Sequence, residues 1–294
     1  MEGTLKMAFF QFEFLQNALM TGLMIGLIAP VLGVFIVVRK QALIADALSH
    51  ITLAGIAANL LLGKWSTVFA GVNPVYMGMV FSVSGALLIE RLRKVYKHYE
   101  ELAIPIIMSA GIGLSVIFIS LADGFNTDLF NYLFGSIISV TRSDVWTIFV
   151  VMVVVLAVIW ALYKELFVLS FDEEQAKLSG IKGSGILLVF MAMTALVIAA
   201  SMKIVGILLV SSLMTLPVAA SIRVARGFKQ AFILSVIFGE TAVISGLILS
   251  YYLDLASGGT IVICSVIILL LAISYKKWKM TGEEKIYGPK SYDR

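Results

Sequence analysis

The chain has 294 residues, of which 60% are hydrophobic and 14% are charged, and its mean hydropathy is +1.01. Soluble globular proteins have about 45–50% apolar and about 25% charged residues, so this composition excludes a soluble domain and indicates a membrane protein. The net charge of +4 comes from basic residues at the ends of apolar segments, which disfavours nucleic-acid binding. The single cysteine, Cys264, lies in an apolar run, where we expect an unreactive core thiol.

Apolar segments follow one another along nearly the whole chain. A transmembrane helix needs about 20 mainly apolar residues. The sequence predicts nine candidates, at residues 14–38, 43–62, 67–89, 104–122, 145–163, 184–202, 204–222, 230–253 and 258–275. Residues 128–140 are too few to cross and are expected to form a half-helix on one side, and only Lys203 separates two of the nine candidates.

The predicted fold class is therefore all-α: a polytopic helical membrane protein with eight or nine transmembrane helices. A single transmembrane domain is expected over residues 1–276 and a flexible cytoplasmic tail over residues 277–294, because charged residues and glycines replace the apolar run there.

Lysine and arginine predict the orientation, because cytoplasmic loops of membrane proteins carry an excess of both. If the loop with Arg39 and Lys40 is cytoplasmic and the spans alternate, eighteen of the 22 basic residues lie on the cytoplasmic side. The other four are Lys6, Lys64, Arg142 and Lys203. We therefore expect the amino terminus outside the cell and the carboxyl terminus inside.

Three ionisable residues are not explained by this topology. Of the 18 acidic residues, only Asp46 and Glu240 lie well inside apolar runs, and His50 is one of only 2 histidines. An ionisable side chain at the middle of a bilayer costs a few kcal/mol, so such a residue is a candidate for function. Asp46 and His50 are four residues apart, so on a helix they project from one face, one turn apart. At about 1.5 Å per residue, His50 and Glu240 would lie about 15 and 16 Å from the basic residues that begin their spans.

These three side chains are predicted to form a metal site near the middle of the membrane. Two carboxylates beside a neutral imidazole carry a formal charge of about −2, which a buried site has to balance with a cation. Imidazole and carboxylate ligands suit zinc, and carboxylate oxygens also suit manganese. Two other interpretations stay open: Asp46 and His50 form a structural hydrogen-bonded pair, and Glu240 is protonated or relays protons.

The source of energy for any transport is expected to lie outside this chain. The sequence has neither the motif of an ATP-binding phosphate loop nor the His-Glu-x-x-His motif of an intramembrane metalloprotease, so we expect no enzymatic activity. Two cytoplasmic segments are candidates for contact with a partner. Residues 170–180 have the pattern of a short capped helix that starts at Ser170 or Asp172 and ends at Gly180, and residues 217–227 combine small and basic residues. Ordinary interfacial turns would show the same patterns.

Several segments together resemble the permease subunits of bacterial ABC importers for zinc, manganese and iron, the ABC-3 family. They are residues 30–40 and 46–55, residues 132–137, residues 170–176 and residues 205–220. The resemblance extends over roughly residues 14–276. It implies a type II importer architecture in a bacterial cell membrane, with a homodimeric permease among the lipids, two copies of a cytoplasmic ATPase and an extracellular metal-binding protein.

The same resemblance implies roles for particular residues. Asp46, His50 and Glu240 match positions along the transport pathway, and the ATPase would contact residues 171–180 and 218–229. Residues 209–220 look closer to the zinc branch, so zinc is the expected cargo and manganese or iron the alternative, with no permanently bound cofactor.

A different class of transporter is the more distant alternative. In a proton- or sodium-coupled secondary transporter, Asp46 and Glu240 would be the coupling carboxylates, but the sequence has no visible internal duplication of the kind common in such proteins. A membrane scaffold without transport would leave the three buried ionisable groups without a role.

Overall fold

The computed structural model describes residues 12–122, 124, 127–181 and 183–287, and these residues form helices and connecting segments without a strand. Eight helices in this described part of the chain are long and apolar enough to cross a membrane. They are α2 (Glu13–Val38), α3 (Leu43–Trp65), α5 (Pro74–Val95), α6 (Ala103–Leu121), α8 (Arg142–Ala161), α11 (Gly183–Val205), α13 (Phe228–Leu253) and α14 (Ser257–Tyr287). The remaining predicted span, at residues 204–222, forms a shorter apolar helix, α12 (Ile207–Val224). The all-helical, multi-pass membrane fold predicted from the sequence is confirmed.

Short helices complete the fold between the long ones. They are α4 (Thr67–Ala70), the 3-10 turn η1 (Glu100–Leu102), α7 (Thr127–Phe134), α9 (Tyr163–Phe171) and α10 (Glu173–Leu178). Helix α7 is the predicted half-helix. The predicted capped helix in residues 170–180 is α10: the Asp172 carboxylate accepts a hydrogen bond of 2.8 Å from the Gln175 amide, and Gly180 follows the helix with φ of +78°.

Two predicted boundaries are wrong. The span predicted at residues 67–89 begins instead at Pro74, because Asn73 caps α5 by accepting a hydrogen bond from the Val75 amide. The break predicted at Lys203 lies at Gly206, whose φ of +83° ends α11 and starts α12. The span predicted at residues 258–275 agrees with the apolar part of α14, and the helix continues to Tyr287 because charged residues that favour helix follow directly. The last tail residues, 288–294, lie outside the described residues.

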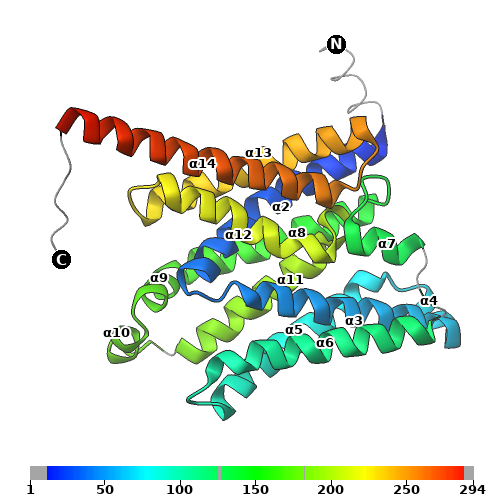
Figure 1. The fold of residues 1–294 in the computed structure, drawn as a ribbon. Coiled ribbons are helices and arrows are strands. Elements are labelled where there is room, and N and C mark those ends of the chain that lie inside the picture. The colour runs from blue at the N-terminus through cyan, green and yellow to red at the C-terminus, as the bar shows by residue number, and fades with distance from the viewer. Residues whose placement is uncertain (1–11, 123, 125–126, 182, 288–294) are drawn as a thin grey trace.

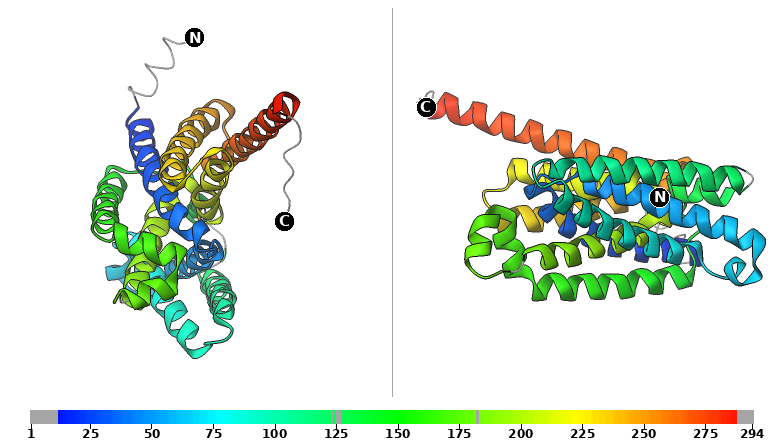
Figure 2. Two further views of the ribbon diagram at one scale, coloured as in Figure 1. Left: turned by 90° about the vertical axis from the view of Figure 1, so that its left-hand side faces the viewer. Right: turned by 90° about the horizontal axis from the view of Figure 1, so that it is seen from below.

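The long helices lie roughly side by side, with α4, α7 and the start of α2 at one end of the bundle and α9 and α10 at the other (Figure 1). We call these the outer and the inner end, following the orientation predicted from the basic residues. The last part of α14 projects beyond the rest of the bundle at the inner end, as Figure 1 and the right view of Figure 2 show.

Helix α12 packs against four of the long helices, α2, α3, α13 and α14, so it lies inside the bundle. Its backbone touches that of α2, because a Cβ atom on Gly33 would overlap the carbonyl oxygen of Met214. The centre of α2 is fully buried, with Ile25, Leu32 and Phe35 at 0% exposure. The bundle therefore has close-packed central helices, and the candidate site residues lie on the helices that surround them.

Candidate functional site

Asp46 and His50 lie on α3, half-buried and one turn apart as predicted. Asp46 is in the first turn of the helix, and its carboxylate is close enough to the His50 ring for Coulombic attraction. Helix α6 approaches α3 here through Gly111, where a Cβ atom would lie 3.1 Å from the His50 carbonyl carbon and 3.0 Å from the Ile51 amide nitrogen. The close approach of α6 fixes the position of the backbone that carries His50.

Glu240 lies half-buried on α13, against α2. A Cβ atom on Gly26 would lie 3.1 Å from Glu240 Oε2, so the absence of a side chain in α2 makes room for the carboxylate. Glu240 Oε2 is buried and has no hydrogen-bond partner among the described residues. A buried carboxylate oxygen without a donor is costly, and a cation or a proton would satisfy it.

The three predicted residues are not brought together as one cluster. Asp46 and His50 are on α3 and Glu240 is on α13, and α12 packs against both of these helices. Among the described residues, no three His, Cys, Asp or Glu side chains lie close enough together to hold a metal ion. The predicted site is therefore divided, within one chain, into an Asp46–His50 pair and a separate Glu240.

The helix boundaries place the candidate residues along their own helices. Because α3 begins at Leu43 and α13 at Phe228, His50 lies about 10 Å and Glu240 about 18 Å along its own helix at 1.5 Å per residue. Glu240 is thus near the middle of α13, and the Asp46–His50 pair is in the first two turns of α3. The equal depth of His50 and Glu240 expected from the flanking lysines stays a prediction.

A second carboxylate, Glu90, lies at the level of Asp46 and was treated in the sequence as a span end. Gly85 of α5 faces Ile51 of α3, and from that contact both Glu90 and Asp46 lie five residues further toward the inner end of these two antiparallel helices. Glu90 is 6% exposed and accepts a hydrogen bond of 3.0 Å from Ser184 Oγ. In the sequence, Glu90 follows the apolar residues Leu87, Leu88 and Ile89 and precedes a basic run, and this position gave no signal of its burial.

At the outer end, sequence reasoning missed a buried ion pair between Asp144 and Lys203. Lys203 Nζ lies 2.8 Å from Asp144 Oδ2, and the two side chains are 15% and 7% exposed, respectively. The carboxylate also accepts hydrogen bonds from the Thr141 amide (2.9 Å), Thr141 Oγ1 (2.6 Å) and Asn73 Nδ2 (3.3 Å). The pair fastens the outer ends of α5, α8 and α11 together. The Thr-x-x-Asp spacing of a capping box was its one visible sequence signal.

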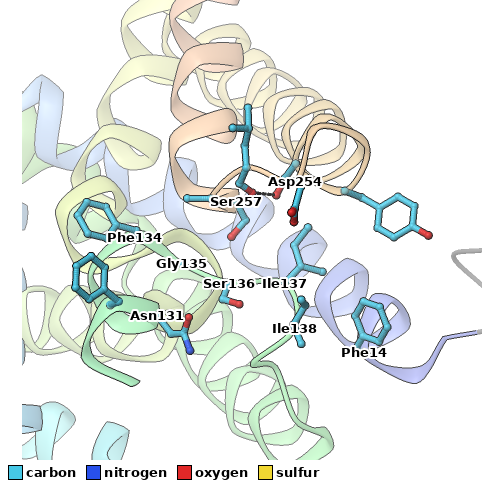
Figure 3. Close-up of a pocket in the computed structure, with 14 residues that line it drawn as sticks. Phe14, Asn131, Phe134, Gly135, Ser136, Ile137, Ile138, Asp254 and Ser257 are labelled. Carbon is cyan, nitrogen blue, oxygen red and sulfur yellow. Dashed lines mark hydrogen bonds between the residues drawn. The ribbon is translucent and has the colours of Figure 1, made fainter. Parts of the chain in front are cut away.

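A cavity of about 460 Å³ also opens at the outer end, between the segment that follows α7 and the turn between α13 and α14 (Figure 3). Asn131, Ser136 and Asp254 contribute polar groups to its wall, and Phe14 and Phe134 contribute apolar ones. Neither Asp46 nor His50 lines it, and Asp254 is the one carboxylate among its described lining residues.

Known proteins resemble this chain over almost its whole length. A probable metal transport system membrane protein of Treponema pallidum is 35% identical over 90% of this chain and 96% of its own length. The manganese transport system membrane protein MntC of Listeria monocytogenes is 32% identical over 90% of this chain and 91% of its own. The high-affinity zinc uptake system membrane protein ZnuB of Haemophilus influenzae is 34% identical over 89% and 97%.

A solved structure shares the fold. The structure of PsaBC from Streptococcus pneumoniae in complex with Fab contains a chain that matches with a TM-score of 0.81 and 31% identity, over 95% of this chain and 100% of that one. The sequence model of the ABC 3 transport family matches residues 11–276, which includes every helix that carries a candidate site residue. This multi-pass cell-membrane chain therefore belongs to the ABC 3 transport family and is a permease of the metal-importing kind.

Proposed function

We propose that the chain is the membrane-spanning permease of an ATP-driven importer that passes zinc from an extracellular binding protein to the cytoplasm. Asp46, His50 and Glu240 are proposed to contact the ion on its way. The observation that carries this proposal is the position of these three groups on spanning helices of a metal-transport family, with one Glu240 oxygen buried and lacking a donor. An imidazole and a carboxylate one turn apart present the ligand types that zinc accepts.

Because the three groups are divided between α3 and α13, we propose successive contacts rather than one simultaneous site. The ion would contact Glu240 near the middle of α13 and the Asp46–His50 pair near the start of α3 in separate steps. The Asp46–His50 pair would bind a cation only while the His50 imidazole is neutral, so protonation of His50 would favour release of the ion.

Manganese is the second candidate for the cargo. The relative named for manganese transport is 32% identical and the relative named for zinc uptake is 34% identical, so overall similarity does not separate the two metals. Carboxylate oxygens suit manganese, and an imidazole does not exclude it. We propose zinc on the ligand chemistry of His50 and treat manganese as the direct competitor in the test.

We propose two protein partners and a second copy of this chain. A cytoplasmic ATPase would bind residues 171–180 and 218–229, and ATP would be hydrolysed there. This is supported by exposed large apolar side chains on these two segments: Leu178 is 89% exposed, Phe171 60% and Ile222 45%. An extracellular metal-binding protein would deliver the ion, and two permeases would form a homodimer.

Uptake into reconstituted vesicles tests the proposal. The permease is reconstituted with its partner ATPase, and the uptake of zinc and of manganese is measured with and without ATP. A competition series then measures zinc uptake at increasing manganese concentration. Asp46→Asn, His50→Ala and Glu240→Gln should each reduce zinc uptake about tenfold or more, the effect of losing about 1.4 kcal/mol of ion binding. His98→Ala and Glu101→Gln are matched controls, because both side chains are exposed outside the spans, and they should transport normally.

Each outcome has a defined meaning. If all three variants transport like the unmodified chain, the proposed ion contacts are wrong. If manganese displaces zinc, the cargo is manganese. If uptake needs a proton gradient and no ATP, the chain is a secondary transporter.

A further inference from the structure

Seven aromatic side chains gather at the inner end of the bundle, and we call them the aromatic cluster. They are Phe35 on α2, Tyr163, Phe167 and Phe171 on α9, Phe190 on α11, and Phe228 and Phe232 on α13. They come from four helices spread over nearly 200 residues of sequence. No periodicity within a single helix would reveal them as a group.

Phe228 is in contact with four other rings of the cluster. Its ring centroid lies 5.1 Å from that of Phe167 and 5.7 Å from that of Phe171, both edge to face. It lies 5.8 Å from Phe35 and 6.4 Å from Phe232. Edge-to-face rings at these separations attract one another beyond their hydrophobic contact and hold a defined mutual orientation.

The cluster joins two segments that are far apart in sequence. Phe171 begins the first segment proposed to contact the ATPase, residues 171–180, and Phe228 lies at the end of the second, residues 218–229. The same rings reach the bundle core, because Phe35 is 0% exposed and also contacts Phe190 at 6.0 Å. A hydrogen bond of 3.1 Å from Arg39 Nη1 to the Leu169 carbonyl connects α2 to α9 beside the cluster.

We propose that the aromatic cluster makes the two ATPase-contacting segments move as one unit with α2 and α13, and that Phe228 is its central positioning residue. Close-packed side chains resist compression, so a displacement of α9 or of the turn before α13 is passed to the neighbouring helix. Helix α13 carries Glu240, and α2 carries Gly26, which makes room for it. The inference rests on the proposed function for the identity of the partner and the cargo.

The first test measures coupling, the number of ions transported per ATP hydrolysed, in vesicles that contain the permease and its ATPase. Phe228→Ala should transport at least about fivefold fewer ions for each ATP that the complex hydrolyses, the lower end of usual coupling effects between sites. Phe228→Tyr keeps the ring at this half-buried position and should restore the ratio. Phe149→Ala on α8 is the control, because Phe149 is a 42% exposed phenylalanine outside the cluster.

The second test replaces the ring contact with a covalent one. In Phe167→Cys/Phe228→Cys, ions per ATP should be low, and a short bifunctional thiol reagent should restore the ratio by linking α9 to α13. Single-cysteine variants treated with the same reagent should not recover. The chain's own thiol, Cys264, is 7% exposed on α14 and belongs to the background that these controls measure.

A purely structural cluster gives different results. If Phe228→Ala lowers transport and ATP hydrolysis in proportion, with ions per ATP unchanged, the proposal is overturned. It is also overturned if the cross-link leaves the double variant uncoupled. If Phe228→Ala fails to assemble, the double cysteine variant decides alone. Failure of the unmodified complex to transport zinc or manganese would count against the proposed function and not against the cluster.

Discussion

Replacing Lys203 by methionine should destabilise the protein strongly, because it leaves the buried Asp144 carboxylate without its cation. The ammonium lies 2.8 Å from the carboxylate, and both side chains are at most 15% exposed. Removing one partner of a buried pair costs about 3–5 kcal/mol. The three hydrogen bonds from Thr141 and Asn73 remain and continue to satisfy the carboxylate, so we expect a loss near the lower limit, about 3 kcal/mol.

The assay is a double-mutant cycle on the free energy of unfolding of the purified permease in lipid nanodiscs. Lys203→Met and Asp144→Asn should each be costly, and the double variant should lose less than their sum by about 2 kcal/mol, because no unpaired charge remains. Arg142→Met is the matched control, since it removes an exposed positive charge at the same end of the bundle. Equal stability of Lys203→Met and Arg142→Met, or strict additivity in the cycle, would refute the reasoning.

Three other variants test the packing on unfolding midpoints measured in the same nanodiscs. Gly33→Ala should lower the free energy of unfolding by about 1–3 kcal/mol, because its Cβ would overlap a backbone carbonyl of α12. At Gly113 a Cβ atom has open space, so Gly113→Ala should be neutral or stabilising. Thr141→Val removes the cap of α8 and one donor to the buried carboxylate, and should cost about 1 kcal/mol; a larger loss than that of Lys203→Met would contradict the assignment of roles. Gly206→Ala should be more harmful than Gly113→Ala, because φ is +83° and a Cβ atom would lie 2.5 Å from a carbonyl oxygen of α7; equal midpoints would show that this turn rearranges.

Local sequence signals predicted the helices well where the chemistry is local. Apolar length predicted nine spans, and in the described part of the chain eight of them are long crossing helices and one is the shorter α12. The Asp172 cap and Gly180 predicted α10. The errors lie where one apolar run contains a turn. Asn73 and Pro74 start α5 inside a predicted span, and Gly206 separates α11 from α12 three residues after Lys203. Hydropathy averages over a window, so it does not resolve a turn made by one or two residues.

The candidate site was predicted residue by residue but not in its arrangement. Asp46, His50 and Glu240 stood out because an ionisable side chain in an apolar run is rare. These residues are separated because α12 packs against both α3 and α13. The sequences of α3 and α13 do not indicate which helix packs against each of them. Glu90 gave no signal at all, since its hydrogen-bond partner Ser184 lies on another helix, 94 residues away in sequence.

The sequence by itself determined that this chain crosses a membrane several times, because the cost of placing polar groups in hydrocarbon acts on each segment separately. Pairings between distant segments were decided only by the tertiary structure. The ion pair of Asp144 with Lys203 joins residues 59 positions apart, and Phe228 meets Phe35 and Phe167 across three helices. Such contacts depend on which helix faces lie together, and that choice is made by the packing of the whole bundle.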